Sequence, residues 1–263
     1  MKKRILAVLI ATALAVSVTG CAGNATSSSD STSASSVAES SDTSTQTSSD
    51  ASSEEESKEE SSQEESKDLE ANYTKYTLDG DLTQHMIDMS RLNEGNKVRL
   101  ANVIKKLKNG EEVTVGFIGG SITQGTSAGN DLCYAKLTAD WLQKTYSNAK
   151  INYINAGIGA TGSYIGVHRV ENDLLSKNPD LVFVEFSVND TTENTERNKK
   201  SYDGLLRTIW KSSTNPAIIT IATTQEDGTS FQDQHAEIVK HYDLPMISYR
   251  NTILDTIKHG DIV

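Results

Sequence analysis

The 263-residue chain is poor in hydrophobic residues and in basic charge. Hydrophobic residues make up 36% of it, so either the whole protein is weakly folded or a disordered segment dilutes a normal domain. Lys and Arg number 25 against 36 Asp and Glu, which gives a formal net charge of −11. Because nucleic-acid-binding proteins present a basic surface to phosphate, this balance argues against a nucleic-acid partner.

The acidic charge comes from one segment. Residues 22–70 hold thirteen acidic and two basic residues, whereas residues 71–263 hold 23 acidic and 20 basic residues. The segment is rich in Ser and Glu and has no aromatic residue, so it cannot bury enough surface to offset its ordering entropy. We predict that residues 21–70 are a disordered tether and that residues 71–263 form one folded domain. The alternative is an acidic segment that binds calcium or a partner, although nothing in it fixes a ligand geometry.

The chain begins with a hydrophobic run that is short for a membrane span. Three basic residues at positions 2–4 precede the apolar residues 5–18, a pattern typical of a signal peptide. Residues 18–21 (VTGC) resemble the bacterial lipoprotein box, in which cleavage before the cysteine is coupled to its lipidation. We therefore expect residues 1–20 to be a lipoprotein signal peptide and Cys21 to carry the lipid. The protein would then sit on the outer face of a Gram-positive cell membrane, held only by its lipid; an ordinary secretory signal is the alternative.

Cysteine is scarce, with only Cys21 and Cys133 in the chain. If Cys21 is the lipid anchor, Cys133 is the only thiol and no disulfide can form within the chain, nor does a domain of this size need one. Histidines, cysteines and carboxylates nowhere cluster at metal-ligand spacing, so the sequence predicts neither a metal nor a cofactor.

Strand-like and helix-like patterns alternate through the second part of the chain. The expected strands are at 113–118, 151–154, 181–186, 217–222 and 246–249, and the expected helices at 94–108, 134–146, 167–175, 202–211 and 232–241. This alternation indicates right-handed crossovers and a mainly parallel sheet with helices on both faces. The prediction is a three-layer α/β/α sandwich with its functional residues at the carboxyl ends of the strands.

Two glycines and a serine follow the first expected strand. Gly119 and Gly120 relax the backbone sterics of a sharp turn and present the hydroxyl of Ser121 at the start of the next segment. The motif is not the G-x-S-x-G elbow of α/β-hydrolases, because Thr123 stands at the last glycine, and no Walker lysine follows. The alternative is a plain turn in which Ser121 caps a helix.

The next two strands also end in unusual turns. Residues 155–162 (NAGIGATG) contain G-x-G-x-x-G, and Glu185 lies where a ribose-binding acid could sit, so a nucleotide site is one alternative. Against it, the turn follows the second strand and a lone match is weak evidence. After the third strand, the side chain of Asn189 could donate to a developing oxyanion, or merely end the strand in an Asx turn.

Together and in this order, the three turns resemble the SGNH (GDSL-like) hydrolases, in which Ser, Gly, Asn and His come from four sequence blocks. The resemblance covers residues 90–263 and implies the flavodoxin-like fold of that family. It implies that Ser121 is the nucleophile, that its amide is one oxyanion donor and that Asn189 supplies a second. The third donor would be a backbone amide at Ala160, where the family has glycine, or at its neighbour Gly159.

Two supporting residues flank this predicted machinery. Gly120 precedes the nucleophile, and Asp190 would brace the third turn rather than react. Ser187 replaces the glycine that usually opens the third block.

The fourth block, Asp-x-x-His, is missing from the sequence. Asp255 and His259 are one residue too far apart, whereas Asp233 and His235 are one residue too close. His235 is interpreted instead as a surface or helix-packing residue. We therefore expect the domain to be C-terminally incomplete and poorly active, since loss of a triad member lowers kcat by about 10³-fold or more.

The resemblance implies a serine esterase that needs no cofactor. It would cleave small acyl esters, acetyl above all, from a carbohydrate or cell-wall polymer through an acyl-serine intermediate. The alternative is a non-catalytic surface module that binds glycans in the same cleft.

Overall fold

The computed structural model describes residues 82–191 and 195–260. The predicted signal peptide (1–20) and tether (21–70), with the lipidation site Cys21, lie outside the described residues. Among the helices of the described ranges, none is both long and apolar enough to cross a membrane.

In the described part of the chain, six strands form one sheet in the order β1-β6-β5-β4-β2-β3. Five of them run parallel, and β1 at one edge is antiparallel to β6. All residues of β4 and β5 are buried, which explains why their sequences are apolar except for Glu185 and Thr220. The strands are β1 (Arg91–Asn93), β2 (Glu112–Gly119), β3 (Lys150–Gly157), β4 (Leu181–Glu185), β5 (Ala217–Ala222) and β6 (Met246–Ser248).

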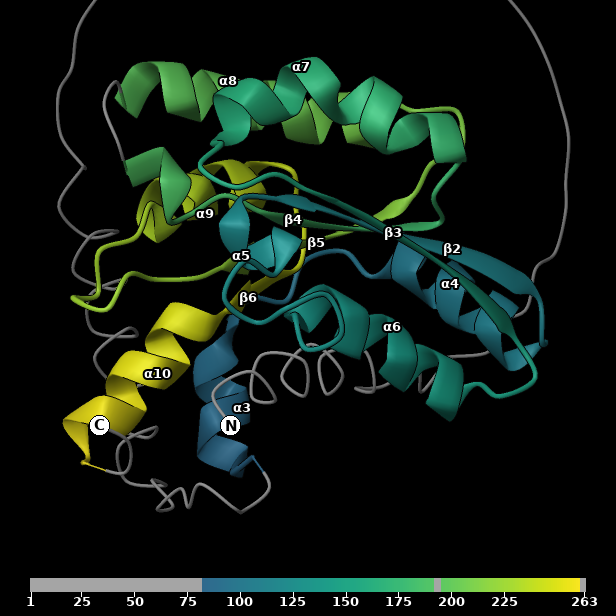
Figure 1. Ribbon diagram of the computed structural model, residues 1–263, viewed down its shortest axis with the longest axis horizontal. Coiled ribbons are helices and arrows are strands. Elements are labelled where there is room, and N and C mark those ends of the chain that lie inside the picture. Colours follow the sequence, from purple (N-terminus) through teal and green to yellow (C-terminus); the bar gives the residue numbers. More distant parts are fainter. Residues whose placement is uncertain (1–81, 192–194, 261–263) are drawn as a thin grey trace, which may run out of the picture. The chain divides into compact units, whose positions relative to one another are not determined.

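Helices cover both faces of the sheet (Figure 1). One face packs against α3 (Gln84–Ser90), α4 (Val98–Lys108), α6 (Tyr134–Thr145) and α10 (Tyr249–Lys258). The opposite face packs against α7 (Ser163–Asp173), α8 (Thr195–Trp210) and α9 (Gln232–His241). Three short helices lie in connections, namely α5 (Ser121–Gln124), η1 (Leu175–Lys177) and η2 (Asn189–Thr191). The predicted three-layer α/β/α architecture is confirmed.

The individual elements agree with the sequence prediction best where the signal is local. The strand at 217–222 and the helix at 232–241 have the predicted bounds. The strand expected at 151–154 is twice as long, and the helix expected at 167–175 begins four residues earlier. Three elements are not predicted by the sequence pattern, namely α3, β1 and α10, which pack together at one end of the sheet.

The order of the strands creates a switch point beside β2. From β2 the chain crosses to β3 on one side and then to β4 on the other, as in flavodoxin-like sheets. In the register of the sheet, Gly119 at the end of β2 pairs with Gly157 of β3 and with Glu185 of β4. The three turns of interest therefore leave the same edge of the sheet side by side, in the crevice where open α/β sheets bind ligands.

Candidate active site

The turn after β2 is compressed against its neighbours. A Cβ at Gly119 would lie 2.0 Å from Thr123 Oγ1, and a Cβ at Gly120 would lie 2.1 Å from Asn189 Oδ1. Both positions thus require glycine, and the side-chain amide of Asn189 lies directly against the residue before Ser121. Gly120 is the N-cap of α5 and Ser121 is its first residue, so the interpretation of Ser121 as a helix cap is wrong.

Ser121 itself is half-buried and opens into a pocket. The pocket has a volume of about 270 Å³, and its lining also includes Leu132, Tyr134, Thr223 and Tyr249. Within the described part of the chain, the Ser121 hydroxyl makes no hydrogen bond. An apolar pocket of this size beside a free hydroxyl suits a small acyl group better than a charged ligand.

The turn after β3 reaches the same place. A Cβ at Gly159 would lie 3.9 Å from the Cβ of Ser121, and the Gly159 amide donates to Gln124 Oε1 over 2.8 Å. Ala160 has a φ of +57°, the left-handed conformation that glycine adopts without strain. The methyl group of Ala160 is thus tolerated in a glycine-like backbone, at a cost of about 1 kcal/mol.

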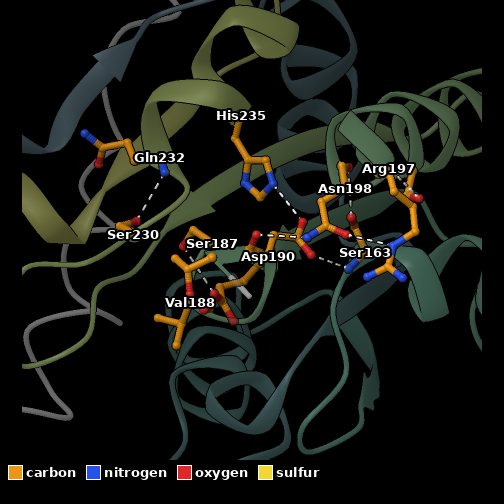
Figure 2. A network of polar contacts seen from close by, with 12 residues as sticks. Ser163, Ser187, Val188, Asp190, Arg197, Asn198, Ser230, Gln232 and His235 are labelled. Carbon is orange, nitrogen blue, oxygen red and sulfur yellow. Dashed lines mark hydrogen bonds and ion pairs between the residues drawn. The ribbon is translucent and has the colours of Figure 1, made fainter. Parts of the chain in front are cut away.

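The turn after β4 is fixed by the carboxylate of Asp190, which is almost completely buried. Asp190 Oδ1 accepts the amide of Ser163 at the start of α7 over 2.8 Å, and Oδ2 lies 2.9 Å from His235 Nε2 in α9. The backbone carbonyl of Asp190 accepts from Asn198 in α8 over 3.0 Å. Figure 2 shows Asp190 at the centre of these contacts. The turn that carries Asn189 is therefore bonded to all three helices of one layer.

His235 is wholly buried, so its interpretation as a surface residue is wrong and helix packing is right. Its ring stacks on Tyr202 with a centroid distance of 3.5 Å. Burial lowers the pKa of His235, and the nearby Asp190 only partly opposes this shift. The ring is thus neutral at physiological pH and donates from Nε2 to the carboxylate of Asp190.

No histidine of the described ranges lines the Ser121 pocket. His85 lies in α3, where Nε2 is 2.6 Å from Asp255 Oδ2 of α10. His259 follows α10 and contacts the same aspartate. The structure therefore brings together Ser121, Gly120, Asn189, Asp190, Gly159 and Ala160, and it shows no base among the described histidines.

The nucleotide alternative does not fit the geometry of the second turn. The carboxyl group of Glu185 has no exposed surface and bonds to Thr223, so it cannot meet a ribose in the crevice. Gly162, the last glycine of the motif, packs against Asp190: a Cβ there would lie 2.5 Å from Asp190 Oδ1. These glycines serve close packing between turns.

A serine at the switch point of a parallel sheet, with an asparagine amide beside it, defines the α/β serine hydrolases that use donors from several turns. Residues 117–246 match the GDSL-like lipase/acylhydrolase family. The chain therefore contains a GDSL-like lipase/acylhydrolase domain, which includes all three turns, as the resemblance implied.

Two solved structures similar to this chain are of a two-domain esterase (CEX) active on acetylated mannans. The one co-crystallized with mannopentaose is 42% identical, with a TM-score of 0.64, and the match covers 66% of this chain and 48% of that one. The other is 41% identical with the same TM-score, and the match covers 66% and 47%. The chain spans about half the length of these structures. No curated protein matches it.

Proposed function

We propose that this chain is the serine-esterase part of a protein that removes acetyl groups from a carbohydrate polymer. The observation that carries the proposal is the meeting of Ser121, Asn189 and the glycine-rich turn at one point of the sheet edge. The similarity to an esterase active on acetylated mannans supports acetyl as the acyl group and a polysaccharide as the substrate.

In the proposed reaction, Ser121 Oγ attacks the ester carbonyl carbon and loses its proton to a base. The carbonyl oxygen becomes an oxyanion, which the Ser121 amide, the Asn189 side chain and one amide of the second turn would stabilise. The tetrahedral intermediate then releases the sugar hydroxyl, which takes up a proton, and leaves acetyl-Ser121. Water attacks this ester in the second half of the cycle, which releases acetate and restores the hydroxyl.

For the amide of the second turn, we propose Ala160 rather than Gly159. The Gly159 amide is already bonded to Gln124 Oε1. The Ala160 amide has no acceptor among the described residues, and its left-handed φ is the one expected of the family's glycine. An oxyanion can use Ala160 without displacing a protein group.

The origin of the catalytic base is a separate proposal. Because no described histidine lines the pocket, we propose that the base comes from residues other than 82–191 and 195–260. The chain as given would then react slowly, since serine is a weak nucleophile without a base. Lipid anchoring at Cys21, export to the outer face of the membrane and the tether are proposals supported by the sequence pattern alone.

The first test is covalent labelling with a fluorophosphonate probe. Wild-type protein should be labelled on Ser121, and Ser121→Ala should lose the label entirely because no other described serine meets the oxyanion donors. Ser176→Ala, which changes an exposed serine bonded to a carbonyl in α7, is the matched control and should label like wild type. Equal labelling of Ser121→Ala and wild type contradicts the proposal. Mannan binding without labelling or acetate release would favour the glycan-binding module instead.

A further inference from the structure

Glu185 is a buried acid that the proposed reaction does not use. It is the last residue of β4, it pairs with Gly119 in the sheet, and its side chain has no exposed surface. Its carboxyl group contacts hydroxyls: Oε1 lies 2.6 Å from Thr223 Oγ1 and 3.4 Å from Ser187 Oγ, and Oε2 lies 3.5 Å from Thr123 Oγ1. A buried carboxyl held by neutral groups is costly to ionise.

The three hydroxyls belong to the three segments that build the site. Thr123 lies in α5, two residues after Ser121. Ser187 lies in the turn two residues before Asn189, and its Oγ also accepts the amide of Thr223 over 2.7 Å. Thr223 follows β5 and lines the pocket. The carboxyl group of Glu185 thus contacts the turn that carries Ser121, the turn that carries Asn189, and Thr223 of the pocket lining.

No lysine or arginine within the described ranges forms an ion pair with Glu185. The charged or titratable groups around it are Asp190 of η2, Tyr134 of α6 and Tyr202 of α8. The nearby guanidinium of Arg169 in α7 instead donates to the backbone carbonyls of Gly119 and Ala156.

This surrounding places the titration of Glu185 near neutral pH. Burial raises the pKa of Glu185 to about 7, and the negative charge of Asp190 acts in the same direction. The hydroxyls of Thr223 and Ser187 oppose the shift because they donate to the ionised form. The carboxyl therefore changes charge around neutral pH.

We propose that Glu185 is a positioning residue of the esterase site, whose protonated carboxyl holds the turns of Ser121 and Asn189 in register. The hydroxyls of Thr223 and Ser187 donate to Oε1, so the proton of the neutral carboxyl belongs on Oε2, which faces Thr123. Ionisation makes Oε2 an acceptor only, so its contact with Thr123 reverses and the contacts between the three segments rearrange. The inference rests on the proposed function. It assigns to Glu185 no contact with substrate.

The test compares wild type with Glu185→Gln, which keeps the size of the side chain but cannot ionise. The first readout is the NMR shift of the Asn189 side-chain amide and of the Ser121 backbone amide between pH 5 and 9. Both should follow one titration near pH 7 in wild type and lose it in Glu185→Gln. The second readout is hydrolysis of a small acetyl ester. In wild type, kcat should fall about tenfold as the pH rises through 7 with KM unchanged, because small misplacements cost rate rather than affinity. Glu185→Gln, a neutral isostere of the protonated carboxyl, should keep the kcat that wild type has at low pH and lose this inflection.

Two further variants separate positioning from a merely structural role. Asp255→Asn removes another little-exposed carboxyl, bonded to His85 far along the chain, and should leave both amide titrations and kcat unchanged. Thr223→Val removes the shortest contact of Glu185 and should move the inflection to higher pH, because the ionised form loses a donor.

The inference is overturned if Glu185→Gln keeps the wild-type titrations of both amides, or if it alters unfolding alone. If wild type neither hydrolyses the ester nor takes the fluorophosphonate label, the proposed function fails. The NMR titration then still decides whether Glu185 couples the two turns.

Discussion

Two aspartate–histidine contacts lie in different regions of the molecule and resemble each other closely. Asp190 and His235 join η2 to α9 behind the candidate site, and Asp255 and His85 join α10 to α3 at the far edge of the sheet. Each pair resembles half of a catalytic triad, yet none of the histidines in residues 82–191 and 195–260 lines the Ser121 pocket. The difference lies in what the carboxylate also holds. Asp190 fixes the turn that carries Asn189, whereas Asp255 fixes two helices to each other.

Of the variants at these two pairs, Asp190→Ala should have the largest effect. The substitution removes the cap of α7 and the hydrogen bond of a buried histidine, so the free energy of unfolding should fall by about 3 kcal/mol. Labelling of Ser121 should fall about 100-fold, because the Asn189 turn loses its anchor. Urea unfolding and the rate of fluorophosphonate labelling measure the two effects. Asp190→Asn, which still accepts the Ser163 amide, should restore part of both; if it does not, the cap is not the important contact.

The second prediction concerns pH. The contributions of Glu185 and His235 to the free energy of unfolding change in opposite directions as the pH rises. The pKa of Glu185 is raised to about 7 on folding, so the stability that it contributes is full below pH 4.5 and is lost as the pH rises through 7. The pKa of His235 is lowered, so its contribution is full above pH 6.5 and declines as the pH falls. Relative to wild type, Glu185→Gln should gain up to about 3 kcal/mol in the free energy of unfolding between pH 4.5 and 8. Urea titrations at several pH values test this, and a constant difference contradicts it.

The third prediction uses the remote pair. Asp255→Asn weakens the contact between α3 and α10, so the free energy of unfolding should fall by about 1–2 kcal/mol. Labelling of Ser121 should stay at the wild-type rate, since Asp255 does not line the Ser121 pocket and contacts His85 and His259 instead. A parallel loss of labelling would show that the two regions are coupled.

The smallest expected effect is that of Ala160→Gly. Its φ of +57° strains an alanine but not a glycine, so the substitution should stabilise the fold by less than about 1 kcal/mol, offset in part by the flexibility of glycine when unfolded. The labelling rate should change less than twofold, because the amide keeps its place. Thermal unfolding and labelling of the two proteins measure the difference. A large loss of labelling would mean that the methyl group helps to shape the turn.

Elements with local sequence signals could be predicted, whereas contacts between residues far apart in the chain could not. The buried strands and the three turns carry local signals, in apolar runs such as β5 and in the glycines beside Ser121. The start of α7 carries none, because the group that caps Ser163 is Asp190, 27 residues further along. His85 and Asp255 are 170 residues apart, and no periodicity in either segment predicts their contact.

The residues of the site also divide into those with a local sequence signal and those without one. The motif spacing pointed to Ser121, Asn189 and Ala160, and the backbone of Ala160 has the conformation expected of a glycine. The role of Glu185 was missed because its partners come from three separate turns. The sequence of β4 does contain one indication. An acid at the end of an otherwise apolar strand is buried with its neighbours, and a buried acid needs hydrogen-bond partners.

The antiparallel edge strand β1 has a mechanical consequence. It is three residues long and pairs only with β6, and β5 and β4 separate this pair from β2 in the sheet. Tension applied at residue 82 would reach α3 and β1 first and would peel them from the edge. Strands β4, β2 and β3, which end beside the turn of Ser121, lie toward the opposite edge of the sheet and keep their pairing while α3 and β1 detach. Under a stretching force, we expect the edge near residue 91 to give way before the pairing of β2 with β3 and β4.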